Sequence, residues 1–204
     1  LKYISTTTSA NFGNMISMAL ASLVLPFLPM LAKQILLNNF LSDIPSMGIA
    51  SDNVDREWEN TPHRWNIREI RNFMVVFGLV SSLFDVLTFA ALYLLAEKGP
   101  EVFRSGWFVE SLLTQLLTIF IVRTYRPFYQ SRPATLLLLS AAAIGLLAVG
   151  LPYSPIASWF GLVPLPLPIL LTVLAISLAY MGAAEWVKRL FYRRQRLSRA
   201  RAAP

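Results

Sequence analysis

Polar side chains interrupt the apolar segment between Ile35 and Pro45, and their spacing allows them to act together. Asn39, Ser42 and Asp43 are three and four residues apart, so a helix brings them to one face. A carboxylate at membrane depth costs roughly 2.5–3.5 kcal/mol on insertion scales and is seldom kept without a function. The segment therefore predicts part of an ion path, with Asp43 as its charged member.

A second polar pair lies in the preceding apolar segment. Asn11 and Asn14 are three residues apart and share a helical face. Because a turn containing Pro26 and Pro29 separates the two segments, we expect antiparallel neighbouring helices, with Asn14 and Asp43 at comparable depth. Five oxygen-bearing side chains would then converge, a donor set that suits hard cations. The alternative for the two Asn is simple hydrogen bonding between helices.

Two later apolar segments add candidates. Asp85, in SSLFDVLTF, supplies a second carboxylate, and no Lys or Arg lies in a mid-membrane stretch to pair with it. Gln115 offers a further polar position. By contrast, Glu110 and Trp107 lie near the expected outer end of their segment, so we expect them at the membrane interface.

Composition indicates a membrane protein. The chain has 204 residues, of which 55% are hydrophobic and 14% charged, against roughly 25% charged in soluble domains. It has no Cys and one His, which excludes disulfides, thiolate metal sites and His clusters. Seven of its eighteen Lys and Arg fall between Lys188 and Arg201, directly after an apolar run. That position indicates an anchor at an anionic lipid surface rather than a nucleic-acid interface.

The predicted fold is all-α, a polytopic six-helix transmembrane bundle, because a helix needs about 20 apolar residues to span a bilayer. The predicted spans are 7–25, 30–49, 72–96, 107–122, 134–151 and 165–187. Residues 50–71 form a polar loop and residues 188–204 a basic tail. Basic residues are most frequent in these segments and in the 123–132 loop, which predicts that both ends of the chain are cytoplasmic.

Several motifs, in order and spread over the whole chain, carry a resemblance. KYISTTTSANFGN, LPFLPM, NNFLSD, DNVD and SSLFDVLTF, followed by SGWFVESLLTQ and PFYQSR, resemble the C-terminal membrane half of P-type cation-transporting ATPases. The bacterial magnesium-transporting type is the most similar. The resemblance implies that the six spans correspond to the fifth to tenth helices of such a pump.

The resemblance also implies a set of cation-binding residues, none of them catalytic. They are Asn11 and Asn14 on the fifth helix, Asn39, Ser42 and Asp43 on the sixth, Asp85 on the seventh and Gln115 on the eighth. Calcium pumps of the superfamily carry Glu at one of the fifth-helix positions and at the eighth-helix position. The fewer carboxylates here suit one divalent ion at most, with Mg²⁺ as the transported ion.

The phosphorylated Asp of the family, in a DKTGT sequence, does not occur in this chain. We therefore expect a fragment that is inactive alone and depends on ATP only through domains of the same pump outside it. The resemblance implies magnesium import across a bacterial inner membrane, with loop 50–71 passing motion to the spans. The alternatives are a P-type pump for calcium or protons, or a free-standing six-helix transporter or scaffold.

Overall fold

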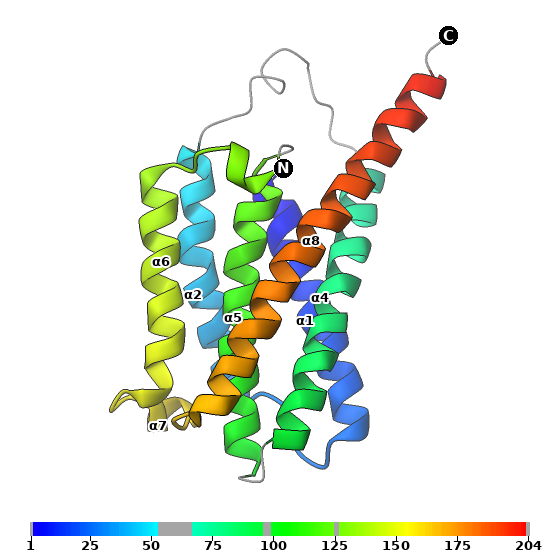
Figure 1. Cartoon of the computed structure of the whole chain (residues 1–204). Helices are drawn as coiled ribbons and strands as arrows, with labels where there is room; N and C mark the ends of the chain where they lie inside the picture. Colours follow the sequence, from blue (N-terminus) through cyan, green and yellow to red (C-terminus); the bar gives the residue numbers. More distant parts are fainter. Residues whose placement is uncertain (1, 53–66, 96–98, 125–126, 203–204) are drawn as a thin grey trace.

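The structure is a computed structural model that describes residues 2–52, 67–95, 99–124 and 127–202. Within these ranges the chain forms seven α-helices and three short 3-10 helices, and no β-strand. The long helices run side by side as a bundle (Figure 1). The predicted all-α, membrane-type fold is confirmed.

The long helices fall in the predicted segments. They are α1 (Lys2–Val24), α2 (Ala32–Met47), α4 (Ile67–Leu95), α5 (Pro100–Val122), α6 (Thr135–Gly150) and α8 (Leu167–Ala202). The short ones are η1 (Gly48–Ser51), η2 (Phe128–Gln130), η3 (Leu151–Tyr153) and α7 (Ala157–Phe160). Four segments of the described chain are long and apolar enough to cross a membrane, namely Ile70–Leu95, Pro100–Val122, Thr135–Tyr153 and Leu167–Arg193. α1 and α2, which carry most of the polar candidates, are not among them.

Helix α5 is the centre of the bundle. Most of its residues are buried, and it packs against α1, α2, α4, α6 and α8. Its own large apolar residues, such as Phe108, Leu112 and Ile119, lie in the main hydrophobic core. On the outer helices α6 and α8, Leu side chains such as Leu139 and Leu178 are exposed instead. An apolar exterior of this kind suits a lipid environment.

The start of α5 differs from the predicted span, which began at Trp107. Gly99 has a positive φ of 92° and Pro100 takes the first helical position, an arrangement that favours a helix start. The helix therefore begins seven residues earlier than predicted. As a result, Trp107 and Glu110 do not lie at the start of the helix, as expected, and both side chains are buried inside the bundle.

Helices α1 and α2 are antiparallel, as predicted, but they touch over only a short stretch. α1 packs mainly along α4, while α2 packs against α5 and α6 (Figure 1). Gly13 and Gly78 allow the close approach of α1 and α4, since a Cβ on Gly13 would lie 3.0 Å from the Gly78 carbonyl oxygen. Small residues at such crossings are typical of membrane helix packing. Polar side chains of α1 and α2 line a pocket where the two helices are apart.

Both ends of the chain lie at the same end of the bundle (Figure 1). We call this the tail side, and the opposite end, where residues 25–31 join α1 to α2, the turn side. The predicted basic tail is not a separate segment, since α8 continues without a break to Ala202. In the predicted loop 50–71, residues 67–71 belong to α4, and residues 53–66 lie outside the described part of the chain.

Candidate functional site

A pocket of about 190 Å³ lies between α1, α2 and α5 on the tail side of the membrane-spanning region. We call it the tail-side pocket. Its polar lining consists of Thr7 and Asn11 from α1, Asn39, Ser42, Asp43 and Ser46 from α2, and Gln115 from α5. The structure thus brings five of the seven predicted residues to one pocket. Asp43 is the only acidic residue in its lining.

The α2 side of this pocket follows from helical spacing. Asn39, Ser42, Asp43 and Ser46 recur at intervals of three and four residues and so share one face. The Ser42 hydroxyl donates to the backbone carbonyl of Asn39 at 3.0 Å, which is the structural role that Ser commonly has in a helix. Its oxygen lone pairs remain available to the pocket.

A larger pocket of about 540 Å³ continues from the first toward the turn side. We call it the turn-side pocket. It shares Asn11 and Asn39 with the tail-side pocket, and its remaining polar lining is Asn14, Asn38 and Trp107. Three Met residues, Ile35 and Ala19 complete it. Asn14 therefore lies at the turn-side pocket and not, as predicted, in one group with Asp43.

Ser111 of α5 joins the polar residues of three helices. Its hydroxyl accepts hydrogen bonds from the Asn38 side-chain amide at 3.0 Å and from that of Gln115 at 3.2 Å. It donates to the Asn14 side-chain oxygen at 3.3 Å. A hydroxyl has one donor and two acceptor positions, so this arrangement uses all three. Sequence reasoning missed both Ser111 and Asn38.

Asp85 lies behind the turn-side pocket rather than in either lining. Its carboxylate accepts hydrogen bonds from the Ser17 hydroxyl at 2.6 Å and from the Trp107 indole at 2.8 Å. Because Trp107 itself lines the turn-side pocket, Asp85 adjoins the pocket through that ring. The prediction that Asp85 adds its charge directly to the Asp43 site has no support in this geometry.

Glu110 is a further buried carboxyl that sequence reasoning placed at the membrane surface. It is fully buried, and neither of its oxygens receives a hydrogen bond. No three His, Asp or Glu side chains of the described residues gather as a metal-binding group. Any cation here must rely on amide and hydroxyl oxygens as well as on carboxylates.

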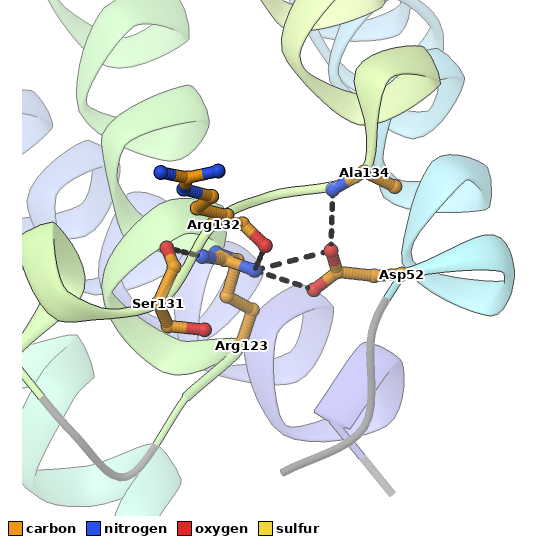
Figure 2. A network of polar contacts seen from close by, with 5 residues as sticks. All are labelled: Asp52, Arg123, Ser131, Arg132 and Ala134. Atoms are coloured by element: carbon orange, nitrogen blue, oxygen red, sulfur yellow. Dashed lines mark hydrogen bonds and ion pairs between the residues drawn. The ribbon is translucent and has the colours of Figure 1, made fainter.

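A buried ion pair fixes the chain on the tail side of α2, directly after η1 (Figure 2). Arg123, which follows α5, donates to both carboxylate oxygens of Asp52 at 3.1 and 2.9 Å. It also donates to the backbone carbonyls of Ser131 and Arg132. Asp52 in turn accepts the backbone N–H of Ala134 at 2.8 Å. We call these five residues the Asp52 joint, since they connect α2, α5 and the start of α6.

The two charges of the Asp52 joint, which come from the predicted loops 50–71 and 123–132, are buried. The side chains of Arg123 and Asp52 are 1% and 3% exposed. Burial of two charges is tolerated when they pair closely and bond to further groups. The joint therefore positions the helix that carries Asp43.

Sequence comparisons identify the family of this chain. Residues 27–190 match the model of a family described as "Cation transporting ATPase, C-terminus". The chain belongs to this family. It therefore forms the C-terminal membrane region of a P-type ATPase, as the sequence motifs indicated.

Individual relatives agree with this assignment. The chain is 44% identical over 199 residues to "Magnesium-transporting ATPase, P-type 1" of Salmonella typhimurium, covering 95% of this chain and 22% of that protein. It is 42% identical over 199 residues to the protein of the same name in Escherichia coli K12, with the same coverage. A "Plasma membrane ATPase" of Neurospora crassa is 30% identical over 98 residues, covering 46% of this chain and 10% of that protein. The chain thus spans about a fifth of the length of the magnesium-transporting relatives.

Proposed function

We propose that this chain supplies the membrane half of an ATP-driven magnesium import pump, with the cation site in the tail-side pocket. The observation that carries the proposal is the lining of that pocket, in which one carboxylate, Asp43, is surrounded by Asn11, Asn39, Ser42 and Gln115. Hard cations prefer such oxygen donors, and Mg²⁺ keeps several of its waters when it binds. The names of the relatives favour Mg²⁺ over Ca²⁺ or protons.

The five residues have different parts in this proposal. Asp43 supplies the negative charge that offsets part of the dehydration cost of the ion. The amide oxygens of Asn11, Asn39 and Gln115 and the Ser42 hydroxyl bind the ion or its waters. Asn14 belongs to the path that leads to the site from the turn side, and Asp85 contributes charge to that path from behind Trp107.

The remaining parts of the pump lie outside this chain. ATP hydrolysis belongs to cytoplasmic domains of the same protein, so we expect the chain alone to be inactive. The density of Lys and Arg toward the end of α8 favours a cytoplasmic tail side in contact with anionic lipids of a bacterial inner membrane. The turn side then faces outward, and import moves the ion from the turn side to the tail side.

The test is Asp43→Asn in the full-length pump. ATP hydrolysis is measured in reconstituted vesicles at fixed MgATP while free Mg²⁺ is titrated, with free Ca²⁺ titrated in parallel. We expect Asp43→Asn to abolish the Mg²⁺-dependent component without lowering the amount of folded protein. Glu101→Gln is the matched control, because Glu101 is an exposed carboxylate in the first turn of α5, and we expect it to behave as the wild type.

Two results would overturn the proposal. Normal ion-stimulated hydrolysis by the Asp43→Asn pump would show that the Asp43 carboxylate is not a ligand of the ion. Stimulation of the wild type by Ca²⁺ and not by Mg²⁺ would retain the site but change the ion.

A further inference from the structure

Amide side chains from three helices converge on one buried hydroxyl, that of Ser111 on α5. Ser111 is 1% exposed, and polar atoms of Asn14, Asn38 and Gln115 lie 3.3, 3.0 and 3.2 Å from its Oγ. A hydroxyl has one hydrogen to donate and two lone pairs that accept. At most one of the three amides can therefore direct its oxygen at Ser111, and the other two must direct an N–H group at it.

The hydrogen of the Ser111 hydroxyl is used by Asn14. Ser111 donates to Asn14 Oδ1, so its lone pairs face the other two amides, and Gln115 donates its Nε2 hydrogen to one of them. If the Gln115 amide turned over, its oxygen would meet the Ser111 oxygen with no hydrogen between them. Such a contact leaves a buried acceptor unpaired, which is unfavourable. The Ser111 hydroxyl thus holds the Gln115 amide in one of its two orientations.

This orientation decides which end of the amide reaches the tail-side pocket. Gln115 lines that pocket together with Asp43, whereas Ser111, one helical turn earlier on the same face of α5, is not part of the lining. Since Nε2 is directed at Ser111, Oε1 is the end of the amide that is free to point elsewhere. Asn38 Oδ1 is enclosed by protein atoms without a partner, but Gln115 Oε1 is not enclosed in this way. The oxygen of Gln115 therefore borders the space of the pocket.

The orientation of an amide matters at a cation site, because only one of its two ends can be a ligand. The carbonyl oxygen binds a hard cation or accepts a hydrogen bond from its waters, whereas the NH₂ end offers only donors. A carboxylate has no such choice, since both of its oxygens accept. Asp43 is the only acidic residue in the lining of the tail-side pocket, so the other side-chain ligands must come from amides and hydroxyls.

We propose that Ser111 is a positioning residue of the cation site, whose hydroxyl keeps the Gln115 carbonyl oxygen directed at the ion in the tail-side pocket. Ser111 itself does not touch the ion. Gln115 accordingly acts as an oxygen ligand and not as a hydrogen-bond donor. This proposal deepens the proposed function and rests on it for the identity and the place of the ion.

Ser111→Ala tests the positioning role, because without the hydroxyl the Gln115 amide can adopt both orientations. ATP hydrolysis by the full-length pump is measured in reconstituted vesicles at fixed MgATP while free Mg²⁺ is titrated. We expect the half-saturating concentration of free Mg²⁺ to rise about threefold, the size of effect that one lost hydrogen bond has. We expect kcat to stay at the wild-type value, because the ligand is still present and only its orientation is lost.

Gln115→Glu supplies the second background for this test. A carboxylate presents an oxygen in either orientation, so Ser111 has nothing left to select. We therefore expect Ser111→Ala to leave the half-saturating concentration unchanged when it is combined with Gln115→Glu. The wild type, the two single variants and the double variant form a double-mutant cycle. A purely structural role of Ser111 would raise the constant by the same factor in both backgrounds.

Ser177→Ala is the matched control for the removal of a buried hydroxyl. Ser177 is also buried, and its hydroxyl donates to the Val173 carbonyl of its own helix, so we expect a wild-type half-saturating concentration. If Ser111→Ala gives too little folded pump, Ser111→Cys replaces it. The thiol keeps the approximate size of the side chain and is a weak donor and acceptor, so we expect the constant to rise in this variant as well.

Two results would overturn the proposal. One is a half-saturating concentration that neither Ser111 variant changes. The other is a rise that is equally large in the Gln115→Glu background, which would make Ser111 a structural residue. The proposed function fails in a different way, namely if the wild type shows no Mg²⁺-stimulated hydrolysis or if Asp43→Asn retains it, so the two failures are distinguishable.

Discussion

The chain enters two buried polar regions in this part of the bundle, one around the middle of α2 and one at Asp52, directly after η1. In the middle, Asn38, Asn39, Ser42 and Asp43 border pockets, and Asn38 Oδ1 is left without a partner. At the end, the Asp52 carboxylate accepts three hydrogen bonds from Arg123 and Ala134. The chain from α2 through η1 to Asp52 therefore presents a free oxygen at one level and fully bonded oxygens at another.

The difference separates a binding site from a structural joint. Buried polar groups that satisfy each other fix helices in one arrangement, because any movement leaves a charge unpaired. A buried acceptor without a partner has a free-energy cost, which a ligand or a water that donates to it would remove. On this basis we propose that the Asp52 joint holds α2 in place and that the tail-side pocket binds the cation.

Breaking the joint should have the largest effect on stability. Arg123→Met leaves the buried Asp52 carboxylate without its cation, and we expect a loss of about 3–5 kcal/mol in the free energy of unfolding. The measurement is denaturant unfolding of the full-length pump in detergent. A loss below about 1 kcal/mol would show that the joint does not hold α2.

The double variant Asp52→Asn with Arg123→Met is the control for this prediction. It removes both charges and keeps an oxygen for the Ala134 N–H. We therefore expect it to be more stable than Arg123→Met alone. A double variant that is no better would assign the loss to packing of the Arg123 side chain and not to the unpaired charge.

A smaller effect is expected from Asp85→Asn. This variant tests whether a carboxylate that lines neither pocket contributes less to ion binding than Asp43, which lines one. The amide offers one acceptor where Ser17 and Trp107 now find two, so we expect a loss of about 1–3 kcal/mol in stability. Because Asp85 lies behind Trp107, KM for Mg²⁺ should change less than about threefold in the same vesicle assay. An Asp85→Asn pump that folds but is as inactive as Asp43→Asn would make Asp85 a direct ligand.

Residues on one helix face could be predicted from the sequence. The spacing of Asn39, Ser42 and Asp43 needs only the helical repeat, and the structure places all three at one pocket. The helices themselves follow from apolar length, and their positions agree with the expected segments to within about five residues, except at the start of α5 and at the end of α8, which continues to Ala202. There, Gly99 and Pro100 were the available signal, and reading them would have placed Glu110 well inside the helix.

Contacts between distant segments could not be predicted. Asn38 and Ser111 are 73 positions apart, and Asp52 and Arg123 are 71 apart. Each residue alone has a common explanation, as a helix Ser bonded to its own backbone or as a charge in a polar loop. Only the packing of α2 against α5 shows that these side chains meet. The same holds for α1, whose main partner is α4 rather than its neighbour in the sequence.

The smallest effect is expected at the other ion-paired group of the tail side, on α8. Glu185 pairs with the buried Lys188 at 2.7 Å and with Arg189 at 3.3 Å, where the Arg189 side chain is 53% exposed. Exposed pairs contribute little because water and salt screen them. We therefore expect Arg189→Ala to leave the unfolding midpoint unchanged within error, whereas Lys188→Met, which also removes a bond to the Ile121 carbonyl, should lower it measurably. Equal unfolding midpoints for the two variants would show that burial does not determine how much a charged group of this bundle contributes to stability.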